Sequence, residues 1–142
     1  IIGVAGTIQT VMADGLIIDT IINAFAQAIM ALPKAVQVLG MYCMQTIINL
    51  PINSGTGQAA ATMPIMAPVG DLVGVSRQTT VLAFQLGDGF TNAIFPTSST
   101  MLGFLAASKI PYAKWLKYVL PLMAILFVLG GIFVMVAPAI GY

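Results

Sequence analysis

The sequence predicts an all-α polytopic membrane protein that combines transmembrane helices with a re-entrant helical hairpin and a discontinuous helix. Of its 142 residues, 59% are hydrophobic and only 6% are charged, and the mean hydropathy is +1.02. A soluble domain carries about 25% charged residues, so these few charges could not cover so much apolar surface. Polar, glycine-containing stretches also divide the apolar sequence into short segments, which predicts interrupted helices rather than a plain bundle.

Two segments have the length of a transmembrane helix, which needs about 20 residues. The first is residues 1–32, although Asp14 and Asp19 interrupt its apolar pattern. The second is residues 116–137, which contains a long apolar run without a charge. The chain starts without methionine on an apolar stretch, and we therefore expect it to be the C-terminal part of a longer protein.

Residues 35–72 are predicted to form a re-entrant hairpin with its tip at residues 51–57. The apolar stretch before the tip is shorter than a transmembrane helix, and so is the stretch after it. The tip sequence, PINSGTG, contains a proline and two glycines, through which a helix does not easily continue. Two short helices around a polar tip would enter and leave the membrane on the same side.

Residues 78–107 are predicted to form a transmembrane helix that is broken at residues 87–99. The stretch GDGFTNAIFPTSST, which starts at Gly87, places a carboxylate, an amide, several hydroxyls and a proline between two apolar runs. Non-helical backbone at membrane depth is tolerated only where protein or water satisfies its polar groups. Secondary transporters build their substrate and ion sites from interrupted helices near the midplane, so we expect both breaks to contribute to a binding site.

The hairpin tip and the second break supply the candidate substrate-binding residues. Their hydroxyl and amide groups can bond a solute, and their glycines let the backbone approach it closely. The helices that follow the two breaks would point amide donors at the site, which favours a carboxylate. The candidates are Asn53, Ser54, Gly55, Thr56, Gly57, Thr97, Ser98 and Ser99.

Asp88 is the leading candidate for ion coupling, because an ionisable group at membrane depth is costly and usually faces a cavity. Thr91 and Asn92 could add neutral oxygens, so that Asp88 and Asn92 coordinate Na⁺, or Asp88 could carry a proton. Asp14 is a further candidate for ion coupling. No organic cofactor and no other metal are expected. The structural alternative is that these groups only cap broken helices and bond one another.

The charged residues also predict the orientation of the segments. If residues 35–72 form a hairpin, Lys34 and Arg77 lie on one side of the membrane and the lysines of residues 109–117 on the other. The more basic loop is expected in the cytoplasm. Asp71 and Arg77 flank a turn, where we expect a surface pair, and the aromatic residues of KIPYAKWLK are expected to be interfacial anchors.

The segment NSGTGQAAATMPIMAPVGDLVGVSRQTTVLAFQLGDGFTNAIFPTSS resembles the YfcC-type branch of the C4-dicarboxylate anaerobic carrier family, which belongs to the bacterial ion transporter superfamily. The segments DGLIIDTIINA and KIPYAKWLKYVLPLM are also similar. In this resemblance, residues 54–57 match the hairpin signature. Asp88, Gly89, Thr91, Asn92, Pro96, Thr97 and Ser98 match the signature of the broken helix. Asn53 stands where many members have proline, and Thr56 where they have serine.

The resemblance implies the C-terminal part of a carrier that works by an elevator mechanism as a homodimer. We therefore expect an ion-coupled secondary transporter, not an enzyme, in the bacterial inner membrane, with Na⁺ or H⁺ as the coupling ion. Its partners would be the lipid bilayer, the missing N-terminal part of the same carrier and a second copy. The net charge of +1 gives no indication of a nucleic-acid partner.

The substrate is expected to be a small carboxylate-bearing solute. No lysine or arginine lies at either break, whereas a dianion would usually need such a partner. This favours an amino acid, including a basic one, over a C4-dicarboxylate, which is the alternative. A passive channel, in which the polar breaks form a filter, is a further alternative. An intramembrane aspartyl protease is disfavoured because its Tyr-Asp and Gly-x-Gly-Asp patterns are missing.

Overall fold

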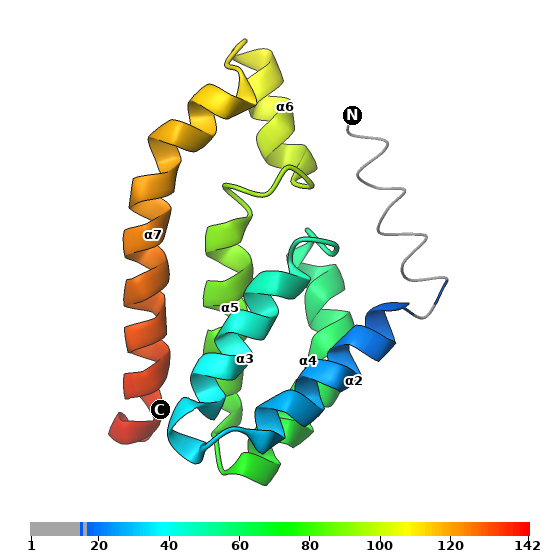
Figure 1. Cartoon of the computed structure of the whole chain (residues 1–142), viewed down its shortest axis with the longest axis vertical. Coiled ribbons are helices and arrows are strands. Elements are labelled where there is room, and N and C mark those ends of the chain that lie inside the picture. Colours follow the sequence, from blue (N-terminus) through cyan, green and yellow to red (C-terminus); the bar gives the residue numbers. More distant parts are fainter. Residues whose placement is uncertain (1–14, 16) are drawn as a thin grey trace.

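The computed structural model describes residue 15 and residues 17–142, and within them it consists of helices and connections, without strands. Figure 1 shows the helices arranged roughly along one axis, with α7 beside the others. The elements are α2 (Ile17–Ala31), α3 (Lys34–Ile48), α4 (Gly55–Val73), α5 (Arg77–Thr91), α6 (Ser99–Ala107), α7 (Tyr112–Val136) and the 3₁₀ helix η1 (Ala137–Ile140). The first half of the predicted span at residues 1–32, including Asp14, lies outside the described residues.

Helices α3 and α4 form a helical hairpin whose tip lies at mid-height of the molecule, beside the connection between α5 and α6 (Figure 1). Helix α3 has 15 residues, which is about 22 Å of helix and less than the roughly 30 Å of a bilayer core. The connection is shorter than the expected tip, because Ser54 caps α4 and Gly55 and Gly57 are already helical.

Helix α4 contains two prolines, Pro64 and Pro68. Its exposed residues recur at every fourth position from Thr56 through Ala60, Pro64 and Pro68 to Leu72. Both prolines therefore lie on the outer face of the helix, away from α3 and α5, where their rings do not disturb the packing of the hairpin.

The break after α5 begins later than the sequence predicts. The expected break starts at residue 87, but residues 87–91 are helical and the non-helical stretch covers residues 92–98. Gly87 is small for a packing reason: a Cβ there would lie 2.9 Å from Gln45 Cβ and 3.0 Å from the Thr46 backbone nitrogen of α3. Helix α5 ends where the chain approaches Pro96, which disfavours helical backbone at the residue before it.

Helix α7 and η1 together form the long apolar helix of the described residues. Residues Tyr112–Ile140 have a mean hydropathy of 2.8 over their most apolar window, and only 22% of that window is buried. Leu122, Ile125 and Val128 each expose more than half of their surface. An apolar surface of this extent is unusual on a soluble monomer, and its length and composition suit a membrane-spanning helix.

The core lies between α3, α4, α5 and α7. Tyr42 is at its centre with no exposed surface, and its hydroxyl donates to the Phe127 carbonyl at 3.2 Å. Its ring stacks at a tilt on Phe127, with a centroid distance of 4.8 Å. A Cβ on Gly130 would lie 2.9 Å from the Tyr42 oxygen, so the absence of a side chain there lets α7 approach α3.

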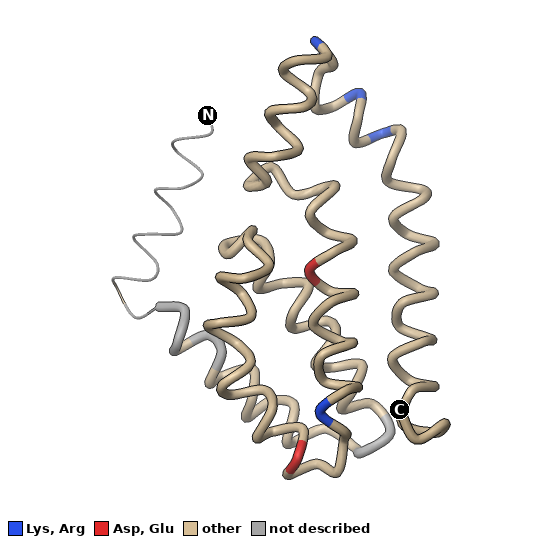
Figure 2. Tube along the Cα trace, turned by 180° about the vertical axis from the view of Figure 1, so that it is seen from behind, with Lys and Arg blue, Asp and Glu red and all other residues tan. Residues whose placement is uncertain are grey.

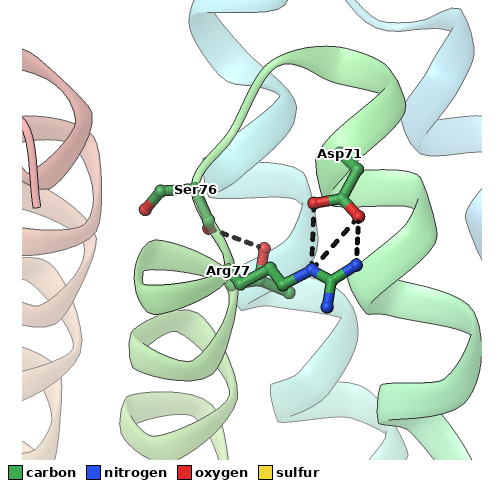
Figure 3. A network of polar contacts seen from close by, with 4 residues as sticks. Asp71, Ser76 and Arg77 are labelled. Carbon is green, nitrogen blue, oxygen red and sulfur yellow. Dashed lines mark hydrogen bonds and ion pairs between the residues drawn. The ribbon is translucent and has the colours of Figure 1, made fainter.

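The basic residues gather at the two opposite ends of the molecule (Figure 2). The turn between α4 and α5 holds the predicted surface pair, which is confirmed: Arg77 and Asp71 approach to 2.8 Å, as Figure 3 shows, and both side chains are exposed. Beside this turn, the Ser76 and Thr79 hydroxyls donate to the Tyr142 carbonyl, which places the end of the chain next to the start of α5. The α6–α7 connection, with Lys109, lies at the opposite end (Figure 1).

Candidate functional site

The hairpin tip and the break after α5 line one open cavity of about 970 Å³. Asn53, Ser54 and Gly55 come from the tip, and Asn92, Ser98 and Ser99 come from the break and the start of α6. Six of the predicted site residues are thus brought to one place from segments about 40 positions apart.

Two helix N-termini open onto this cavity. Ser54 caps α4 by accepting a hydrogen bond from the Gly57 amide at 3.3 Å, and Ser98 caps α6 by accepting one from the Met101 amide, also at 3.3 Å. A helix N-terminus carries a partial positive charge and amides without intrahelical partners. The arrangement can therefore bind a carboxylate from two directions.

Asp88 lies behind the hairpin tip, inside α5 and one turn before its end. It is 8% exposed and does not line the cavity. A Cβ on Gly55 would lie 3.0 Å from Asp88 Oδ2, and Asn92 Nδ2 donates to Oδ1 at 3.3 Å. Among the described residues the ion pair found joins Asp71 to Arg77, so no basic side chain pairs with Asp88 there.

Asn49, at the end of α3, connects the hairpin to the end of α5. Its amide nitrogen lies 3.0 Å from the Asp88 carbonyl, 2.6 Å from Thr91 Oγ1 and 3.0 Å from Asn92 Oδ1. The Thr91 hydroxyl already donates to the Gly87 carbonyl at 2.7 Å, so it accepts from Asn49. Asn49 is completely buried, and it was not among the predicted site residues; an amide at the end of an apolar helix was the signal available in the sequence.

Two carbonyls of the break, those of Ala93 and Ile94, accept hydrogen bonds from α7. Trp115 Nε1 donates to the Ala93 carbonyl at 2.9 Å, and the Tyr112 hydroxyl donates to the Ile94 carbonyl at 2.7 Å. The sequence predicts these two aromatic residues as interfacial anchors, whereas the structure shows that their polar atoms hold the break. This meets the requirement that interrupted backbone be satisfied by protein.

A second buried polar cluster joins the two arms of the hairpin. Gln58 Nε2 donates to the backbone and side-chain oxygens of Gln45, both at 2.8 Å. Gln45 Nε2 in turn donates to Thr62 Oγ1 at 3.1 Å. All three residues have 1% exposure or less. This cluster joins α3 to α4, and none of its residues lines the cavity.

The remaining predicted site residues that the structure describes do not line the cavity. Thr56 is exposed on the outer face of α4, and Gly57 is used in the cap of that helix. Thr91 bonds Asn49 and Gly87, and the Thr97 hydroxyl is buried without a hydrogen-bond partner among the described residues. Asp14 lies outside the residues that the structure describes.

A helical hairpin and an interrupted helix that meet at a polar cavity are the elements from which secondary transporters build their substrate sites. Together with the exposed apolar helix α7, they define a membrane protein of the carrier class. The chain belongs to the C4-dicarboxylate anaerobic carrier family, whose model matches residues 1–139.

Two relatives are similar in sequence to this chain. The chain is 44% identical over 129 residues to an Escherichia coli K12 protein named "Putative basic amino acid antiporter YfcC", a match that covers 91% of this chain and 26% of the relative. It is 32% identical over 136 residues to an uncharacterized protein of Haemophilus influenzae, covering 96% of this chain and again 26% of the relative. The chain therefore spans about a quarter of the length of both relatives. No solved structure matches it.

Proposed function

We propose that the full-length protein is a secondary active, ion-coupled transporter that moves a small carboxylate-bearing solute across the bacterial inner membrane. The observation that carries this proposal is the cavity at which the hairpin tip and the start of α6 meet, with two helix N-termini open to it. Its membership in a carrier family supports the same function. The N-terminal remainder of the carrier would complete the site.

The lining of the cavity favours an amino acid as the solute. Its described polar groups are hydroxyls and amides, from residues such as Asn53, Asn92 and Ser99, and no lysine or arginine lines it. A single carboxylate can be held by helix ends and hydroxyls, whereas a dianion would usually need a cationic side chain. A basic amino acid is consistent with the name of the E. coli relative. The alternative is a C4-dicarboxylate, which the description of the family favours.

Asp88 is the proposed coupling residue. Its carboxylate is enclosed by Gly55 of the tip and by Asn92, and a buried charge without a basic partner is costly. A proton or Na⁺ would neutralise it. To act as a second oxygen ligand for Na⁺, the Asn92 amide would have to turn, because its nitrogen now faces Asp88 and its oxygen faces Asn49. Because Asp88 lies next to Gly55 of the tip, binding of the ion would stabilise the packing of the tip against α5.

The transport cycle is proposed to be of the elevator type. The hairpin and α5 pack closely through Gly87 and are bonded through Asn49, so they would move as one unit within a homodimer. The helix α7 would be one span of a multi-pass protein in the lipid bilayer.

Replacement of Asp88 by Asn in the full-length carrier tests the coupling role. The amide keeps the size of the side chain but removes its charge, so the variant should insert normally and lose accumulation driven by an ion gradient in proteoliposomes. Asp71→Asn is the matched control, because Asp71 is an exposed acid at the far turn, and it should leave accumulation unchanged. Accumulation by Asp88→Asn with the wild-type ion dependence would show that Asp88 is structural. Equilibration of solute without any ion dependence in the wild type would indicate a channel.

A further inference from the structure

Trp115 forms part of an apolar wall of the cavity. The cavity is lined by the polar tip residues and also by an apolar wall that consists of Met101, Phe104, Leu105, Ile110 and Trp115. The cavity is therefore amphipathic, with groups that suit a charged head and groups that suit hydrocarbon. Pockets for small molecules commonly combine such an apolar lining with a few polar groups that fix orientation.

The position of the Trp115 ring is fixed by its neighbours. Its Nε1–H group donates to the Ala93 carbonyl at 2.9 Å, and its ring lies at a tilt to Tyr118 with a centroid distance of 6.3 Å. Tyr112, one turn earlier on α7, holds the adjacent Ile94 carbonyl at 2.7 Å. A ring anchored in this way is preorganised, so that contact with a solute costs little conformational entropy.

We propose that Trp115 is a specificity-determining residue whose ring contacts the aliphatic part of the transported solute. The inference rests on the proposed function. A solute whose carboxylate lies at the helix N-termini would place its remaining methylene groups against the apolar wall. An amino acid with an extended side chain, such as L-arginine or L-lysine, would place its methylene groups against this wall, whereas a short solute with a carboxylate at each end would place its second charge there.

The test uses the purified full-length carrier and four probes: L-arginine, L-lysine, L-alanine and succinate. Affinities are measured from the dependence of thermal stabilisation on probe concentration. The wild type should bind L-arginine and L-lysine at least about tenfold more tightly than L-alanine, because methylene groups in an apolar pocket are worth about tenfold or more each. Trp115→Leu should weaken binding of the two long amino acids about tenfold and leave L-alanine unchanged.

Two further variants separate contact with the solute from support of the break. Tyr112→Phe removes the neighbouring hydrogen bond to the break, but Tyr112 does not line the cavity, so the preference for long amino acids should persist. Trp115→Phe keeps an aromatic ring in the apolar wall and loses the hydrogen bond to Ala93. If the leucine variant does not fold, this variant tests the contact with the solute in its place. It should retain more than half of the wild-type preference but not all of it, because its ring is smaller than that of tryptophan.

The outcomes are distinct. If no probe stabilises the wild type, the proposed function is overturned. If the wild type prefers succinate, the substrate is a C4-dicarboxylate, as in the alternative given above, and the inference about Trp115 is overturned. If both Trp115 variants keep the full wild-type preference, or weaken L-alanine as much as L-arginine, Trp115 only supports the break and the inference fails.

Discussion

Replacing Asn49 by Asp should separate the hairpin from the end of α5. The Asn49 amide group has two hydrogens and faces three acceptor oxygens, which belong to Asp88, Thr91 and Asn92. Asn49→Asp keeps the shape of the side chain but replaces this donor by an oxygen. The variant therefore tests the hydrogen bonds of the site with almost no change in packing volume.

The expected loss in the free energy of unfolding follows from the structure. Two hydrogen bonds contribute about 1 kcal/mol each, and the new carboxylate is buried without a basic partner among the described residues. Removing one partner from a buried charged arrangement typically costs about 3–5 kcal/mol, and we expect a loss of this size in the free energy of unfolding. Lowering the pH should reduce the loss, because a protonated carboxyl regains one donor.

The assay is thermal unfolding of the full-length carrier in detergent. Unfolding is monitored by the labelling of Cys43, which is half-buried in α3 and forms no disulfide. Other cysteines of the carrier are removed first. The apparent Tm of Asn49→Asp should fall by about 5 °C or more. Asn53→Asp is the matched control, because the Asn53 amide nitrogen has no hydrogen-bond partner among the described residues. If both variants melt within about a degree of each other, Asn49 does not hold the hairpin to α5 and the reasoning fails.

Two further predictions concern the tip and the topology. Gly55→Val should abolish transport while membrane insertion persists, because its Cβ would lie 3.0 Å from Asp88 Oδ2. The control is Gly103→Val, which should be tolerated because a Cβ there meets nothing within 4 Å. Equal uptake by both variants would contradict a role for the tip. Single cysteines at Lys34 and Arg77 in a cysteine-free carrier should react with an impermeant reagent from the same side of the membrane, and one at Lys114 from the opposite side. Labelling of the first two from opposite sides would rule out the hairpin.

The positions of the helices and the meeting of the two polar segments could be predicted from the sequence. Pro51 and the polar residues around it mark the connection between α3 and α4, and Ser98 marks the start of α6. The role of the glycines is less evident in the sequence, which predicts that Gly55 and Gly87 interrupt helices, whereas both are helical. At Gly55 the small residue lets a carboxylate approach, and at Gly87 it lets another helix approach. Sequence alone does not distinguish a glycine that ends a helix from one that lets a neighbour come close.

The supporting side chains could not be found from local patterns. Asn49 bonds residues 39–43 positions away, and Trp115 bonds a carbonyl 22 positions away. Each of these contacts depends on how the helices pack, which no short motif encodes. Polar residues next to apolar helices were visible in the sequence, but their partners were not.

The two prolines of α4 restrict what can surround that helix. Proline has no amide hydrogen, so the carbonyls of Ala60 and Pro64, four residues before Pro64 and Pro68, lack their usual intrahelical donor. These carbonyls lie on the outer stripe of α4. Hydrocarbon cannot donate a hydrogen bond, and each unsatisfied group there costs several kcal/mol. We therefore expect the outer face of α4 to meet water or another part of the carrier, which can donate to these carbonyls, rather than acyl chains, even though much of its surface is apolar.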